Sequence, residues 1–509
     1  MRSKKRIMKG RPEVVAILLT AIFILGSIPG FGGDLPWPLS PESPSHGVSY
    51  FYGNQQDMTF PDFSIKHCFH VGMDIPGAEA QIVYAVESGY VKAKFTIFGA
   101  DTHWRIVIAD SAGTGECDGW LYAHIMQASI PVSVGDYVNA GDPIGVLVSW
   151  PSGEPIHLHL SRVRFAGDSA AWANGFWDYK WIANPLLFLA GAGDTISPSM
   201  GDALYNGLFA ICANETDSYF DVGDDISGDV DIVGCAYDYC ASGKDTTNPY
   251  KIEYRIEGDS SIPWTTSFDF GGSIDSYNGE VDELSHVVYK YDNTCNSTTY
   301  PGHNYYFILT NTDGDAILEV DDKNYSWQTP YFHNGEYKIL ARASDFDGNS
   351  YMDSMTVTVR NIHSLTGTVG LEGMSSNLQG TKITVLPDNL TGFTVSGGAY
   401  SLPEVGGGYQ TVSISRLGYI TFDTLLLFDR NHQIDVTLNY VDYTCGDADA
   451  SGGVNILDVS FVISYLYKGG PMPAPPMRAD VDHSGAINIL DVGYTINYLY
   501  KSGPAPNCP

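Results

Sequence analysis

A repeat near the C-terminal end constrains the local fold of this chain more than any other feature of the sequence. The segment GDADASGGVNILDVSFVISYLYKGGP returns as ADVDHSGAINILDVGYTINYLYKSGP, so that Asp447 and Asp480 lie 33 residues apart. Each copy places oxygen-bearing side chains at alternate positions of a twelve-residue loop, with glycine at the bend (Gly452 or Gly485). Oxygen ligands at this spacing suit a hard cation, so each copy predicts a calcium loop followed by a helix.

The expected ligands occupy positions 1, 3, 5, 7, 9 and 12 of each loop, with position 7 contributing its carbonyl oxygen. For the first calcium ion they are Asp447, Asp449, Ser451, Gly453, Asn455 and Asp458. For the second they are Asp480, Asp482, Ser484, Ala486, Asn488 and Asp491. Apolar residues then recur at helical spacing and predict one buried stripe per helix. The two stripes are Ile456, Val459, Ile463 and Leu466, and Ile489, Val492, Ile496 and Leu499.

A duplicated loop and helix with aspartate at position 12 resembles a dockerin module, here over residues 443–509. The resemblance implies two structural calcium ions and a cohesin-like receptor. In well-known dockerins positions 10 and 11 carry recognition. Both copies here have Ile-Leu at these positions, so the side chains either contact a receptor or serve the core. Cys445 and Cys508 bracket the module and are expected to form a disulfide.

The N-terminal residues 1–33 have the pattern of an export segment. A basic start precedes an apolar run over residues 14–28, a length that suits a signal-peptide core better than a spanning helix. Because no Ala-x-Ala cleavage site follows, the segment is either a signal peptide or a retained N-terminal anchor. We therefore expect a secreted or cell-envelope protein. The net charge of −32 excludes non-specific nucleic-acid binding.

All 8 cysteines follow this segment and group by region as two, four and two. An even number in an exported chain favours disulfides. The sequence predicts that Cys68 pairs with Cys117. A second group is expected to pair internally, in an order that the sequence does not choose: Cys212, Cys235, Cys240 and Cys295.

Length and patterning predict a mostly β, multidomain protein, because 509 residues exceed one hydrophobic core. Residues 34–46, rich in Pro and Ser, are expected to be a linker, and residues 47–190 a small antiparallel β domain. Residues 200–361 end in a hairpin that resembles the closing hairpin of an immunoglobulin-like sandwich. Residues 363–440 resemble the carboxypeptidase regulatory-like domain, a small β-sandwich that commonly acts as a spacer. One face of the hairpin is predicted to carry Tyr337, Ile339, Ala341 and Ala343, before a turn at Asp347-Gly348-Asn349.

Two histidines stand one residue apart in the run EPIHLHLSRV, residues 154–163. In a strand, side chains at i and i+2 share a face. His157 and His159 should therefore stand together, while Leu158 and Leu160 face the other way. Such a pair is either a packed polar pair or part of a site.

Three further segments decide between these alternatives. The segment HCFHVGMDIPG holds His70 and Asp74 at i and i+4, and GWLYAHIMQ holds His124, followed by a glycine-rich run. Each motif alone is weak. In this order, and together with the later His-x-His, they resemble the LytM/lysostaphin-type zinc endopeptidases from His70 to Leu189.

The resemblance implies one catalytic zinc ion held by His70, Asp74 and His159, with His124 and His157 as the catalytic histidines. Two imidazoles and one carboxylate leave a fourth zinc position for water, whose pKa the metal lowers. One of the two remaining histidines then takes a proton from this water, and the other steadies the developing oxyanion. The implied substrate is the peptide part of bacterial peptidoglycan or a Gly-rich peptide.

The chain departs from the family pattern beside the second motif, with Pro155-Ile156 before it and Leu160-Ser161 after it, where Phe-Glu is usual. The cleft or the groups behind the ligands should therefore differ. Cys68, two residues before a ligand, is the disulfide partner of Cys117 or else a thiolate ligand. The alternative function is a surface or adhesion protein whose head binds wall polymer without cleaving it.

Overall fold

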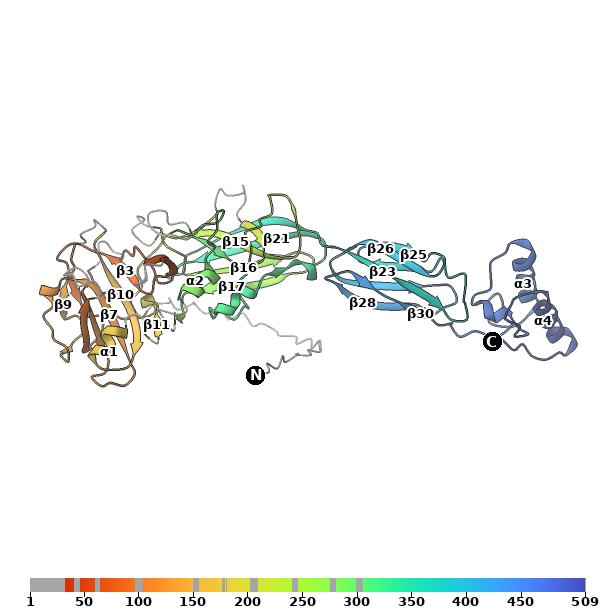
Figure 1. Cartoon of the computed structure of the whole chain (residues 1–509), viewed down its shortest axis with the longest axis horizontal. Helices are drawn as coiled ribbons and strands as arrows, with labels where there is room; N and C mark the ends of the chain where they lie inside the picture. The colour runs from red at the N-terminus through yellow and green to blue at the C-terminus, as the bar shows by residue number, and fades with distance from the viewer. Residues whose placement is uncertain are drawn as a thin grey trace.

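A computed structural model describes most of the chain and shows a mostly β protein, as the sequence predicted. The described residues are 33–40, 46–59, 65–96, 104–149, 155–175, 179, 181–201, 209–239, 246–274, 281–298 and 305–508. Figure 1 shows three groups of strands followed by a helix pair in a row along the long axis. Residues 1–32 of the expected export segment and 41–45 of the expected linker lie outside this part. Within it, no helix has the length and apolarity needed to cross a membrane.

The main sheet of the first group is antiparallel and has eight strands. Seven of them follow the order β18-β11-β10-β7-β6-β5-β8, and the eighth, β3, pairs with β10. The bounds are β3 Met73–Pro76, β5 Gly89–Thr96, β6 Trp104–Ala109, β7 Cys117–Ile125, β8 Tyr137–Val138, β10 His157–Phe165, β11 Trp181–Ala183 and β18 Ser273–Ile274. Two smaller sheets pair β1 (Gln55–Thr59) with β2 (Ile65–Phe69) and β4 (Ile82–Tyr84) with β9 (Pro143–Val146). Short helices are η1 (Gln127–Ser129), α1 (Ser169–Asn174) and η3 (Pro185–Leu187).

Strand β10 follows the alternation that the sequence predicted. Leu158 and Leu160 are fully buried in a core cluster that also holds Met73 and Ile75 of β3. His157 and His159 lie on the opposite face and keep part of their surface exposed. Burial of the leucines therefore presents both histidines on the other side of the sheet.

The second group of strands forms two five-stranded sheets, one of order β12-β15-β13 with β19 and β20 on β15, the other of order β14-β22-β21-β16-β17. The predicted hairpin is confirmed, because β21 and β22 pair from Gly335↔Val359 to Ser344↔Ser350. The bounds are β12 Ser199–Met200, β13 Phe209–Ala213, β14 Asp225–Ile226, β15 Asp229–Tyr237, β16 Lys251–Glu257, β17 Ile262–Asp269, β19 Tyr306–Ile308, β20 Trp327–Gln328, β21 Gly335–Ser344 and β22 Ser350–Val359. Helical segments are α2 (Val281–Val288), η5 (Val320–Asn324) and η6 (Thr329–Tyr331).

The first two groups share one hydrophobic core, which runs from Tyr52 through Trp172 to Val359. Strand β18 extends the sheet of the first group from within the second. Asn54 adds polar contacts, since its Nδ2 donates to Tyr305 Oη at 2.9 Å. These two parts of the chain therefore pack as one body.

The third group forms two four-stranded sheets around a core of its own, with orders β26-β23-β29, where β30 also pairs with β23, and β25-β24-β27-β28. The bounds are β23 Ile362–Leu371, β24 Lys382–Leu386, β25 Leu390–Phe393, β26 Ala399–Gly406, β27 Gly408–Ser415, β28 Phe422–Phe428, β29 His432–Gln433 and β30 Val436–Leu438.

The C-terminal region holds helices α3 (Ile456–Lys468) and α4 (Ile489–Lys501), with η7 (Pro476–Ala479) between them. Val459 and Val492 meet in a small shared core. Asn455 and Asn488 cap the helices, since each side-chain oxygen accepts from a backbone N–H two residues later at 2.8 Å.

The cysteines follow the sequence prediction in part. The Cys445–Cys508 disulfide is formed and closes a separation of 63 residues. The predicted Cys68–Cys117 disulfide is not formed: Cys68 lies in β2 and donates its thiol proton to Gln56 O at 3.3 Å, whereas Cys117 begins β7 in another sheet. Three members of the middle group share one buried cluster, and Cys240 lies outside the described residues. The three are Cys212, Cys235 and Cys295. Cys212 has a free thiol, so the predicted pairing of all four cysteines is wrong for this residue.

Candidate metal centres

The structure brings all five residues of the predicted zinc site together. Strand β10 carries His157 and His159, and β3 lies beside it in the register His159↔Asp74. On the other side of β10, β7 carries His124 near its end. His70 directly follows β2.

Three of these side chains converge on one point. His159 Nδ1 lies 3.0 Å from Asp74 Oδ1 and 3.0 Å from His70 Nε2, and the latter lies 3.3 Å from Asp74 Oδ1. Two imidazoles and a carboxylate form the donor set of a catalytic zinc ion. Cys68 is not part of this group, because its thiol points to the Gln56 carbonyl.

Hydrogen bonds behind the ligands orient both imidazoles for a metal. His70 Nδ1 lies 3.1 Å from Phe51 O, and a carbonyl oxygen only accepts, so Nδ1 carries the proton. Ser161 Oγ donates to Val71 O at 2.9 Å and therefore accepts from His159 Nε2 at 3.0 Å. The nitrogens that face Asp74 are thus the ones left to bind a cation, which is the usual arrangement behind zinc ligands. The residues present fit a zinc ion.

Electrostatics favour the ligand form of Asp74 and His159, which is the ionised carboxylate and the neutral imidazole, but not that of His70. Burial opposes ionisation of Asp74, but the charges of His70 and His157 and hydrogen bonds from His159 and His70 outweigh it and hold its pKa well below the usual range. Burial lowers the pKa of His159 to about 4 and that of His124 well below its usual value. Burial opposes protonation of His70 as well, yet the charge of Asp74 raises its pKa.

The two remaining histidines flank this centre. His157 Nδ1 donates to Pro155 O at 2.8 Å, and its Nε2 lies 3.7 Å from Asp74 Oδ2. The rings of His124 and His157 meet edge to face with centroids 4.7 Å apart. His124 has a φ of 66°, a left-handed conformation that is uncommon outside glycine and concentrates at functional sites.

Sequence reasoning did not single out Gly72, which lies under the His159 ring. A Cβ atom at this position would stand 2.6 Å from His159 Nε2 and 2.7 Å from Ser161 Oγ. The only signal for it in the sequence is a glycine between two expected ligands. Ser161 was noticed only as a departure from the family pattern, although it holds the ligand.

Replacing Ser161 with Ala should weaken zinc binding roughly 10–100-fold, because His159 loses the acceptor that fixes its orientation. Zinc affinity of the full-length protein is measured by competition with a chelator. The matched control is Ser133→Ala on an exposed loop, which should bind zinc as the wild type does. Equal affinity for all three proteins would show that Ser161 does not support the ligand.

The C-terminal loops bring together the three carboxylates that each was predicted to contribute. Asp447, Asp449 and Asp458 place oxygens within 4.8 Å of one another, and the second loop does the same. Its members are Asp480, Asp482 and Asp491. Gly452 has a φ of 99° and Gly485 one of 85°, so the bends need glycine as predicted.

The other predicted calcium ligands have additional roles. Asn455 Oδ1 is committed to capping α3, and its Nδ2 donates to Gly453 O at 3.0 Å. In the second loop Asn488 Nδ2 donates to Ala486 O at 3.0 Å, and Ser484 Oγ lies 3.3 Å from the same oxygen. Ser451 donates its backbone N–H to Asp447 Oδ1 at 2.9 Å. The acidic groups at positions 1, 3 and 12 are therefore the core of each loop.

Removing calcium should make residues 443–509 sensitive to protease, because three carboxylates repel one another in each loop and the core behind them is small. Limited proteolysis of the oxidised full-length protein, with calcium and with chelator, measures this change. The control is Asp423→Asn on exposed β28, which should behave as the wild type. Identical cleavage with and without calcium would exclude a calcium-dependent module.

The antiparallel sheet thus presents a candidate metal site of two histidines and one aspartate with two further histidines beside it, and the C-terminal region presents two acidic loops. Residues 68–170 match the model of Peptidase family M23, and residues 445–500 match the Dockerin type I domain. The chain thus carries an M23 peptidase domain and a C-terminal type I dockerin domain. Neither match reaches the β domains between them, whose immunoglobulin-like and carboxypeptidase regulatory-like assignments stay predictions.

Solved structures resemble parts of the chain. A zinc-containing peptidase from Vibrio cholerae is 17% identical over 26% of this chain and 37% of its own, with a TM-score of 0.20. The catalytic domain of lysostaphin from Staphylococcus simulans is 24% identical over 25% of this chain and 92% of its own, with a TM-score of 0.19. A type II cohesin–X–dockerin complex from Acetivibrio cellulolyticus is 15% identical over 26% of this chain and 94% of that chain, with a TM-score of 0.19. No curated protein matches the sequence.

Proposed function

We propose that this protein is an exported zinc-dependent endopeptidase that hydrolyses peptide bonds in bacterial cell-wall peptidoglycan and docks through its C-terminal module onto a cohesin-like receptor. The observation that carries the proposal is the convergence of His70, Asp74 and His159, with His157 and His124 beside them. Zinc bound to this donor set polarises the scissile carbonyl and lowers the pKa of a bound water. The M23 match supports a cell-wall peptide as the substrate.

The hydrogen-bond pattern of His157 suits a general base. Its Nδ1 proton is donated to Pro155 O, which leaves Nε2 as the nitrogen that receives a proton from the attacking water. About a sixth of its side-chain surface is exposed, at 17%, against 3% for His70. His157 is therefore accessible from outside, as are His159 and Asp74, whose side chains are each 15% exposed.

His124 is suited to stabilise negative charge that develops on the substrate carbonyl. Burial holds its pKa well below the usual value, so the ring is neutral at neutral pH and offers one N–H as a donor. Its backbone is left-handed, and its ring lies edge to face against that of His157. The two histidines thus have different roles in the same step, the addition of water to the scissile carbonyl.

Replacing His157 with Ala should abolish hydrolysis of purified cell wall but leave zinc content unchanged, whereas His159→Ala should lose both. Zinc per chain is measured by elemental analysis, and activity by release of new amino termini from cell wall with and without chelator. His67→Ala, in the middle of β2 with its ring stacked on Tyr291 and outside the constellation, is the control and should retain both properties. Wild-type protein that carries one zinc ion yet cleaves no cell wall would favour the binding-only alternative.

The docking face is proposed from the exposed apolar pair at the start of each dockerin helix. Leu457 is 60% exposed and Leu490 is 65% exposed, and the preceding isoleucines are also on the surface. The alternative that positions 10 and 11 serve the core is therefore wrong, and Ile456 and Ile489 do not belong to the buried stripes. Exposed apolar pairs at equivalent places of a repeat favour a receptor that contacts either copy.

Because both copies present the same pair, replacing Leu457 or Leu490 alone with Asp should weaken cohesin binding only modestly, whereas the double variant should lose it. Binding of the full-length protein to a panel of immobilised cohesin domains in calcium measures this. Leu417→Asp, at an exposed leucine outside the dockerin, is the control. A double variant that binds as tightly as the wild type would exclude this face.

A further inference from the structure

A third group of acidic residues lies outside both centres, at the junction of the first two groups of strands. Asp194 follows η3, Asp238 directly follows β15 and Asp345 directly follows β21. All three are buried, and their carboxylate oxygens lie within 4.8 Å of one another. In the described part of the chain no Lys, Arg or His forms an ion pair with any of them.

Local hydrogen bonds satisfy only part of this group. Asp345 accepts from Asn349 N at 2.8 Å and from Asn349 Nδ2 at 2.7 Å, and Asp194 Oδ1 accepts from Ile196 N at 2.9 Å. Asp238 Oδ1 accepts from Tyr239 N at 2.8 Å, but its Oδ2 is buried without a hydrogen-bond partner. A carboxylate oxygen in this position needs a cation or a proton.

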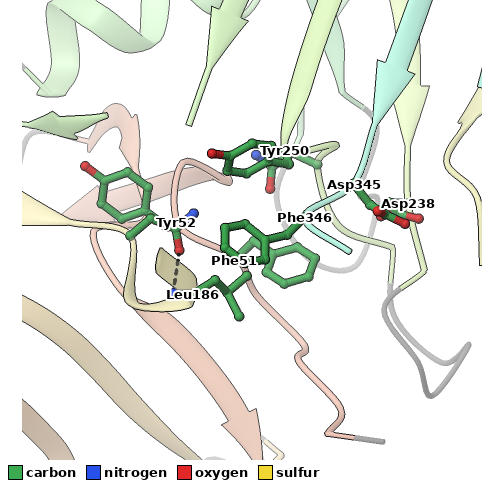
Figure 2. A pocket seen from close by; sticks show the side chains of 9 residues that line it. Phe51, Tyr52, Leu186, Asp238, Tyr250, Asp345 and Phe346 are labelled. Atoms are coloured by element: carbon green, nitrogen blue, oxygen red, sulfur yellow. Dashed lines mark hydrogen bonds between the residues drawn. The ribbon is translucent and has the colours of Figure 1, made fainter. Parts of the chain in front are cut away.

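A second unsatisfied side chain lies close by. Asn248 is 1% exposed, and neither its amide nitrogen nor its amide oxygen has a hydrogen-bond partner. With Asp238 and Asp345 it lines a cavity of about 10 Å³, enough for one water-sized species. Figure 2 shows Asp238 and Asp345 side by side at one end of this cavity and Phe51, Leu186 and Phe346 away from them.

The carboxylates of this group repel one another. Burial, followed by repulsion from neighbouring carboxylates, raises the pKa of Asp238 to about 8 and that of Asp345 to about 6. Asp347 adds a fourth carboxyl group, whose Oδ2 accepts from Asp194 N at 3.2 Å. A divalent cation would relieve this repulsion.

We propose that Asp194, Asp238 and Asp345 bind a calcium ion that fastens the end of the peptidase domain to the β domain that follows it. The donors are oxygens alone, from carboxylates and the nearby Asn248 amide, and such a set favours calcium over zinc. The ion joins segments from three places in the chain. Phe346, beside one ligand, already packs in the core of the peptidase sheet together with Leu189.

Calcium content of the full-length protein tests the proposal, because the dockerin loops bind their ions independently of Asp238. After dialysis against calcium, Asp238→Asn should carry one calcium ion fewer per chain than the wild type. Asp423→Asn, at an exposed position, should carry the wild-type number. Equal calcium content in all three proteins would overturn the proposal and indicate a group neutralised by protons.

Thermal unfolding gives a second, independent readout. In chelator, Asp238→Asn should unfold at the same temperature as the wild type or higher, because it removes repulsion. Calcium should raise the unfolding temperature of the β domains in the wild type but not in the variant. The same rise in both proteins would overturn the proposal. Should Asp238→Asn fail to fold, Asp345→Asn provides the same comparison.

Discussion

The pairing of β3 with β10 is the interaction on which the rest of the peptidase centre depends. It sets His159 opposite Asp74, and burial of Leu158 and Leu160 holds that register. A shift by one residue would turn both histidines of β10 into the core and the leucines into the cleft. Gly72 is part of the same constraint, since only a residue without Cβ leaves room for the His159 ring.

Clustered acidic groups recur in this chain at places where a cation is expected to bind. Asp74 lies among imidazoles, and each dockerin loop gathers three carboxylates. The group around Asp238 has the same character at the junction of two β domains. Phe51 links that junction to the zinc centre, because it lines the cavity while its carbonyl orients His70. The candidate zinc site and the contact between the first two β domains are therefore joined through a single residue.

Much of the candidate sites could be predicted from the sequence, because the relevant spacings are local. Alternation along β10, the i and i+4 pair at His70 and Asp74, and the glycine at each loop bend all follow from backbone geometry over a few residues. The predicted Cys68–Cys117 pairing was wrong. Two cysteines that lie in the same domain can belong to strands of different sheets, and their positions in the sequence do not reveal this. Whether Leu457 serves the core was also undecided, since its exposure depends on how α3 packs against α4.

By itself the sequence determined the mostly β fold class, the two acidic loops and the five residues of the candidate zinc site, because each follows from short-range periodicity or motif spacing. Only the tertiary structure decided that Ser161 holds His159 and that the first two β domains share one core. It alone also brought Asp194, Asp238 and Asp345 together. These residues lie far apart in the chain and belong to no common motif, so their proximity follows from the packing of separate segments against one another.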